Sequence, residues 1–148
     1  MGSVATKRAT PAREAQQLFF EIGMVQRQRV GVALAELGLS FTQAHALRLL
    51  DRERPMPMST LAAKLFCDAS NVTGIADRLE SRGLIERRSA ESDRRVKGLA
   101  LTAAGERMRD RVHELMSEPP EAIAALPASD QRALRDILRR AVENLRSD

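Results

Sequence analysis

The stretch that decides the fold is MSTLAAKLFCDASNVTGIADRLESRGLIERRSAESDRRVKGLALT, residues 58–102. Apolar residues recur at helical spacing up to residue 82, and after Gly83 they follow the pattern of strands. Two helices joined by a turn at Cys67–Asp68 are therefore predicted, followed by a two-stranded hairpin over Ile85–Ser89 and Val96–Leu101. Gly83 fits the left-handed position that commonly follows a helix end. The pattern is typical of a helix-turn-helix with a β-hairpin attached.

The second of these helices has one apolar face and one face of small polar residues. An α-helix fits the major groove of DNA, and short polar side chains near its N-terminus can reach base edges. The low bulk of this face would let the helix sit close to the bases. A solvated helix face with a capping serine is the alternative interpretation. The candidate DNA contacts on this helix are Ser70, Asn71, Thr73, Gly74 and Arg78.

The hairpin that follows is rich in charge. Its five basic residues are Arg87, Arg88, Arg94, Arg95 and Lys97, and its three acidic residues are Glu86, Glu91 and Asp93. Arginine suits a narrow minor groove, where the negative potential of DNA is strongest. We therefore take the five basic residues as candidate DNA contacts. A charged hairpin turn, common in soluble proteins, is the alternative.

Several runs in this stretch resemble the MarR-type winged helix-turn-helix of transcriptional regulators. They are Leu61-Ala62, Ser70–Thr73, Asp77–Glu80, Gly83–Arg87, Asp93–Arg95 and Leu99–Gly105, over roughly residues 41–106. The resemblance implies that Asp93 braces a neighbouring arginine while Arg94 or Arg95 enters the minor groove. One departure is Gly74, where many relatives carry a large or basic residue.

The resemblance also implies an effector site and a dimer. Small aromatic or amphipathic effectors bind in the family between the dimer helices and the DNA-binding module. The residues expected at that junction are Phe20, Met24, Phe41, His45 and Met108, with plain core packing as the alternative. Some relatives sense oxidants through a cysteine. For Cys67, a small residue buried in an apolar turn is the favoured interpretation over a reactive thiolate at a helix N-terminus.

Composition favours a mostly α-helical protein with a small β-hairpin wing. The 148 residues are 43% apolar but only 3% aromatic, with no Trp or Tyr, so strands are short of their preferred residues. A net charge of +4 is compatible with a polyanionic partner such as double-stranded DNA. One cysteine excludes an intrachain disulfide. His45 and His113 match no metal spacing, and no Gly-rich phosphate loop or nucleophile with its base is present, so we expect neither a cofactor nor an enzyme.

The chain divides into four predicted parts. These are a disordered arm over 1–10, a dimerisation helix over 11–38, the winged helix-turn-helix over 39–101, and C-terminal dimerisation helices over 102–148. Thr42 and Ser129, like Ser59 and Asp68, are predicted N-caps. A short strand near Met58 is expected to pair with the wing. The apolar stripes of the flanking helices exceed what one chain can cover, which predicts a two-fold homodimer.

These features together predict a DNA-binding transcriptional regulator. We expect a homodimeric repressor of pseudo-palindromic operators that a small molecule or oxidant releases. The alternative is a helical protein-interaction module that uses the winged fold without reading DNA, against which the clustered arginines count. No apolar run reaches membrane-spanning length and no apolar signal core is present at residues 1–15, so a cytoplasmic protein is expected.

Overall fold

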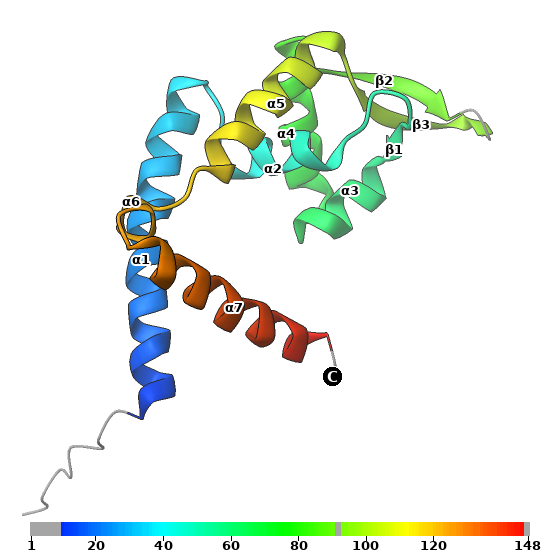
Figure 1. The fold of residues 1–148 in the computed structure, drawn as a ribbon. Helices are drawn as coiled ribbons and strands as arrows, with labels where there is room; N and C mark the ends of the chain where they lie inside the picture. The colour runs from blue at the N-terminus through cyan, green and yellow to red at the C-terminus, as the bar shows by residue number, and fades with distance from the viewer. Residues whose placement is uncertain (1–9, 91–92, 147–148) are drawn as a thin grey trace, which may run out of the picture. The chain divides into compact units, whose positions relative to one another are not determined.

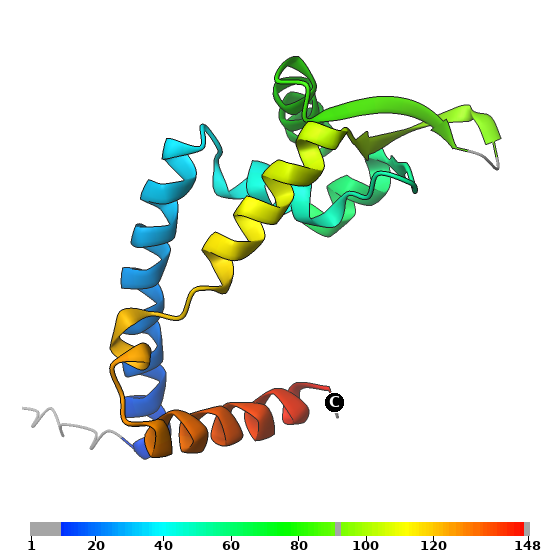
Figure 2. The same ribbon diagram turned by 45° about the horizontal axis from the view of Figure 1, so that its top comes forward.

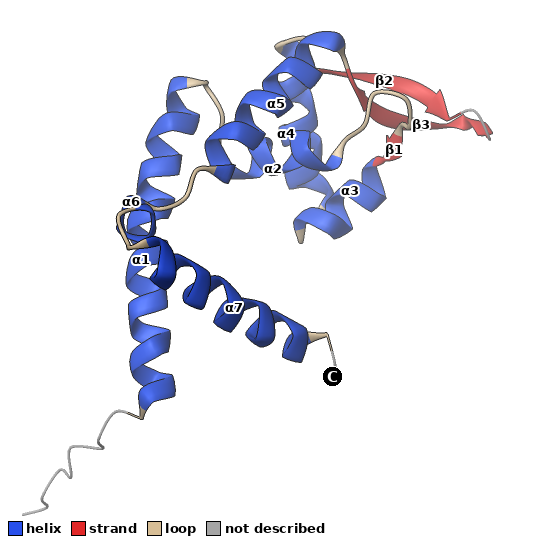
Figure 3. Cartoon of the chain, in the orientation of Figure 1, coloured by secondary structure: helices blue, strands red, loops and turns tan. Residues whose placement is uncertain are grey.

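The computed structural model describes residues 10–90 and 93–146, with the backbone alone for Ala90, Asp93, Arg94 and Val96. The predicted arm therefore lies, apart from Thr10, outside the described residues. The fold is mostly helical with a small antiparallel sheet, as the sequence predicts (Figures 1 and 3). The chain forms two compact units, residues 28–117 and the pair of segments 1–27 and 118–148. Among the described helices, none has the length and apolar character needed to cross a membrane.

The unit of residues 28–117 contains the winged helix-turn-helix. It holds the end of helix α1 and seven further elements. In chain order they are α1 (Pro11–Glu36), α2 (Phe41–Leu49), β1 (Met56–Pro57), α3 (Met58–Leu65), α4 (Ala69–Ser81), β2 (Ile85–Ala90), β3 (Asp93–Leu101) and α5 (Ala103–Ser117). Helices α3 and α4 form the helix-turn-helix, and β2 with β3 forms the wing. Phe66 takes the left-handed conformation at the turn (φ 53°), and Gly83 takes it after α4 (φ 68°), as predicted.

Helix starts are the feature that sequence reasoning placed least well. Asp68 caps α4 as predicted, through its carboxylate and the backbone N–H of Asn71. The Thr42 prediction is wrong, because Ser40 caps α2 in a capping box with Gln43. Ser59 and Ser129 are also wrong as caps. Helices α3 and α7 (Ala128–Leu145) begin two residues earlier than these caps would imply, each directly after a proline that occupies the cap position.

The sheet has the strand order β1-β3-β2, and both pairings are antiparallel. Met56 pairs with Leu99 and Pro57 with Gly98, so the short strand ends at Pro57, one residue before the predicted position at Met58. Strand β3 begins at Asp93 rather than Val96, because the pairing continues past a shift in register between Ser89 and Ala90. Figure 2 shows the hairpin of β2 and β3 extending well beyond the helices of its unit.

The core of this unit is aliphatic and lies where the helices meet the base of the wing. Its largest fully buried side chains are Leu34, Leu47, Leu61, Val72, Leu79, Ile85, Leu99, Leu101 and Val112. Outside the core, the exposed Arg82 links the end of α4 to the residues after α1. The Arg82 guanidinium donates to the carbonyl oxygens of Leu37 (2.9 Å) and Gly38 (2.7 Å). Arg82 thereby satisfies the terminal carbonyl groups that follow α1.

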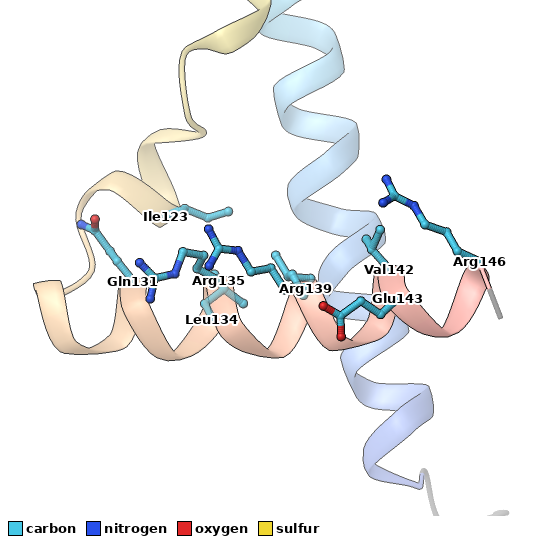
Figure 4. A pocket seen from close by; sticks show the side chains of 9 residues that line it. Ile123, Gln131, Leu134, Arg135, Arg139, Val142, Glu143 and Arg146 are labelled. Carbon is cyan, nitrogen blue, oxygen red and sulfur yellow. The ribbon is translucent and has the colours of Figure 1, made fainter.

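The other unit holds the N-terminal part of α1, α6 (Glu121–Ala124) and α7. Helix α7 has no buried residue, although apolar positions recur along it at helical spacing. A shallow groove runs along this face, between Ile123 of α6 and the side chains of Leu134 and Val142 on α7 (Figure 4). Arginines at 135, 139 and 146 border the groove. This unit therefore presents an amphipathic, uncovered surface.

Candidate nucleic-acid interface

The outer face of α4 carries the five predicted contact residues of this helix. Ser70, Asn71, Thr73, Gly74 and Arg78 are all exposed, while Val72, Ala76 and Leu79 are buried on the opposite face. The Ser70 hydroxyl donates to Asp68 Oδ1, and the Thr73 hydroxyl donates to the carbonyl oxygen of Ala69, both at 2.8 Å. These bonds use the hydroxyl protons, so the exposed oxygen atoms can still accept hydrogen bonds. The face is thus small, polar and held in place by the helix itself.

Asp68 fixes the start of this helix electrostatically. The backbone N–H of Asn71 donates to its Oδ1 at 2.8 Å, and this hydrogen bond, followed by that from the Ser70 hydroxyl, lowers the pKa of Asp68 below 3.8. At a pH near or somewhat below 3.8, Asp68 is therefore protonated in fewer folded molecules than unfolded ones. The carboxylate stabilises the fold above pH 3.8 and loses that effect as the pH falls through the folded pKa.

We expect Asp68→Asn to remove this part of the acid sensitivity. Asparagine is as good an N-cap as aspartate but does not titrate, so stability near neutral pH is nearly unchanged. The check is denaturant unfolding of both proteins at about pH 6 and about pH 3. The variant should lose less stability than the wild type over that interval. Equal losses would mean that the Asp68 cap is not populated in solution.

The two arginines of β2 have different surroundings. Side chains alternate along a strand, so Arg87 shares the face of buried Ile85 and points toward α4. Its Nη2 lies 2.7 Å from Asp77 Oδ1, and its Nη1 donates to Glu80 Oε2. Arg88 points the other way: it donates to the carbonyl oxygen of Arg52, and its Nε lies 3.2 Å from Glu86 Oε1. Both predicted contacts therefore already hold protein partners.

The basic residues of β3 lie farther along the wing. Arg95 and Lys97 are exposed, and Lys97 pairs in register with Ser89 of β2. The side chains of Asp93 and Arg94 lie outside the described part of the structure. The predicted bracing of an arginine by Asp93 and the choice between Arg94 and Arg95 thus stay predictions. The described wing residues show two exposed cations beyond the point where β2 meets α4.

The predicted effector residues fall into both units. Phe41 and Met108 pack against the core of residues 28–117, and His45 on α2 is exposed. Phe20 and Met24 of α1 are 67% and 52% exposed. Cys67 is half-buried against the core. Its thiol donates a hydrogen bond to the carbonyl oxygen of Leu65, with an S···O distance of 3.4 Å. That position fits the interpretation of Cys67 as a small apolar residue of the turn.

Sequence reasoning missed three residues that shape this interface. Asp77 and Glu80 bind Arg87, and Arg82 ties the end of α4 to the end of α1. The alternation of side chains along β2 was the available signal for Arg87, because it places every second residue on the helix side. Arg82 has no such signal, since its partners are backbone carbonyls 44 and 45 residues away. Within the described ranges, no group of three His, Cys, Asp or Glu side chains could hold a metal ion.

Comparison with known proteins gives one family. The family model described as "MarR family" matches residues 39–97. The uncharacterized HTH-type transcriptional regulator YfiV of Bacillus subtilis is 29% identical over 117 residues, covering 76% of this chain and 73% of that protein. The HTH-type transcriptional repressor Rv2887 of Mycobacterium tuberculosis is 27% identical over 132 residues, covering 88% and 92%.

Solved structures show the same fold. The crystal structure of Rv2887 matches with a TM-score of 0.69 at 25% identity, covering 84% of this chain and 91% of that one. MepR, a transcription regulator of the Staphylococcus aureus multidrug efflux pump MepA, matches with a TM-score of 0.76 at 20% identity, covering 88% and 97%. These matches extend well beyond the winged helix-turn-helix into the flanking helices.

Proposed function

Because the chain belongs to the MarR family of DNA-binding transcriptional regulators, which are not enzymes, we propose that it is a homodimeric repressor of pseudo-palindromic operators. The observation that carries the proposal is the outer face of α4. It is exposed, small and polar, and it lies beside an extended basic wing. A helix with these properties enters a major groove, and the wing of the same subunit reaches the adjacent minor groove.

The proposed contacts divide between bases and backbone. Ser70, Asn71 and Thr73 lie in the first turns of α4, where a recognition helix meets base edges. Arg78, later in the same helix, has no ion-pair partner among the described residues and is assigned to phosphate. The wing contributes Lys97 and Arg88 to phosphate, and Arg94 or Arg95 to the minor groove. Asp93 is assigned to bracing the wing rather than to DNA.

The proposed dimer uses the surfaces that one chain leaves uncovered. On α7, Ile137, Val142 and Leu145 are 53%, 44% and 79% exposed. On α1, Phe19 and Val25 are 68% and 67% exposed. Exposed apolar area on this scale marks a protein interface. A second copy supplies the same stripes, and the resulting two-fold axis pairs two recognition helices with two half-sites.

The proposed control is a shift between two dimer populations. In one population the recognition helices match the groove spacing, and in the other they do not. An effector that binds the second population more tightly lowers the affinity for DNA, and the size of the effect is set by its difference in affinity for the two states. Phe20, Met24, Phe41, His45 and Met108 are the residues proposed to meet such an effector. Repression is favoured over activation because relatives that match most of the chain are named as repressors.

The test is selection of binding sites from a randomised duplex pool, followed by titration of the selected DNA across salt concentrations. The proposal expects one pseudo-palindrome, bound by a species of twice the 16.4 kDa chain mass. The logarithm of affinity should fall linearly with the logarithm of salt concentration, because phosphate contacts release counterions. Enrichment of no sequence, with only weak salt-sensitive binding, would contradict sequence-specific reading.

A further inference from the structure

The recognition helix carries acidic residues on the side that the proposed function turns toward DNA. Ser70, Thr73, Gly74 and Asp77 are spaced i, i+3, i+4 and i+7, so Asp77 shares their face. Glu80 lies three residues further along and extends the same stripe. The side chains of Asp77 and Glu80 are 58% and 37% exposed. Two free carboxylates here would repel the phosphates on either side of a major groove.

One cation, Arg87, forms ion pairs with both carboxylates. Arg87 reaches from β2 across to α4, with Nη2 2.7 Å from Asp77 and Nη1 on Glu80. The hydrogen bond that Arg87 donates to Asp77 is the main cause that raises the pKa of the Arg87 guanidinium. A partly exposed ion pair of this kind contributes little to fold stability. Its main effect is on the electric field at the surface of α4.

We propose that Arg87 is a positioning residue that neutralises Asp77 and Glu80, which allows the acidic side of the recognition helix to approach DNA. The proposal rests on the proposed function and replaces the direct DNA contact that the sequence predicts for Arg87. Arg87 acts through α4 rather than by binding phosphate itself. The base of the hairpin thus acts on α4 through Arg87, and its outer part contacts DNA through Lys97 and through Arg94 or Arg95.

A thermodynamic cycle on the full-length protein and its selected operator tests this role. The four proteins are the wild type, Arg87→Gln, the carboxylate-free variant Asp77→Asn/Glu80→Gln, and the variant that combines all three changes. Affinity and its salt dependence are measured for each. Arg87→Gln should lower affinity about tenfold while the carboxylates are present. In the carboxylate-free background it should change affinity less than about twofold and leave the salt slope unchanged.

Two comparisons separate neutralisation from other roles. Lys97→Gln is the matched control for a direct phosphate contact, and it should reduce the salt slope by roughly one in both backgrounds. Arg87→Lys retains the charge but not the two-pronged geometry, so it should keep most of the affinity. If Arg87 merely held the wing in shape, Lys would not rescue binding, and removing the carboxylates would not either.

The outcomes are distinct. A similar affinity loss from Arg87→Gln in both backgrounds, with a drop in slope of roughly one, would make Arg87 a phosphate contact and overturn the proposal alone. A wild type that selects no DNA sequence would overturn the proposed function and the role of Arg87 with it. Full binding by Arg87→Gln with the carboxylates intact would show that their charge is unimportant, which also overturns the proposal.

Discussion

Gly105→Ala should destabilise the protein by about 3 kcal/mol, although alanine is the better helix former. Gly105 is buried in the first turn of α5, and a Cβ built on it would lie 1.8 Å from the carbonyl oxygen of Leu84. That oxygen cannot retreat easily, because it accepts the backbone N–H of Thr102 at 3.1 Å. The Thr102 hydroxyl in turn donates to Gly83 O and accepts the N–H of Gly105.

Helix propensity alone predicts the opposite sign. Alanine exceeds glycine by about 1 kcal/mol in a helix interior, so a free site would gain stability. Denaturant unfolding of Gly105→Ala measures which effect prevails. The matched control is Gly74→Ala in α4, where a Cβ meets no atom within 4 Å and stability should rise. Equal gains at both sites would mean that α5 and Leu84 separate without cost in solution.

The sequence predicts the helix-turn-helix well because the spacing of its apolar residues shows which side of each helix is buried. Val72, Ala76 and Leu79 lie at helical spacing, and each is at most 1% exposed. Helix starts are harder to predict, because several residues before a helix can cap it. Ser40 and Thr42 are both suitable types, and only the capping box with Gln43 selects the first. At Ser59 and Ser129, the proline two residues earlier takes the cap position, which leaves the serine inside the helix.

The wing shows why side-chain roles were harder to predict than elements. The length of β3 depends on its pairing with β2. This pairing outweighs the poor strand propensity of Asp93 and its neighbours. Arg87 and Arg88 are chemically identical, and their roles differ because one shares the face of Ile85 and the other does not. The apolar stripe of α7 is likewise visible in the sequence, but the sequence of one chain does not identify what covers it.

Nothing in the described fold requires a glycine at position 74. Its φ is not in the left-handed region, and a Cβ there would meet no described atom within 4 Å. The fold therefore gains nothing from glycine and forgoes about 1 kcal/mol of helix propensity. The site is exposed on the face of α4 that also carries Ser70 and Thr73. Under the proposed function, close approach of the helix backbone to base edges would account for the glycine, because an added side chain would stand between this helix and the groove.

Substitutions of increasing size at Gly74 should therefore separate stability from DNA binding. Gly74→Ala should raise the free energy of unfolding by about 0.5–1 kcal/mol and weaken operator binding slightly. Gly74→Leu should retain that stability but lower affinity about 10- to 100-fold, the range that base contacts carry. The control Ala63→Leu adds bulk to exposed α3 and should leave affinity unchanged. Affinity that does not fall from glycine to leucine would mean that α4 meets the groove elsewhere along its length, so the assignments of Ser70 and Thr73 would have to move with it.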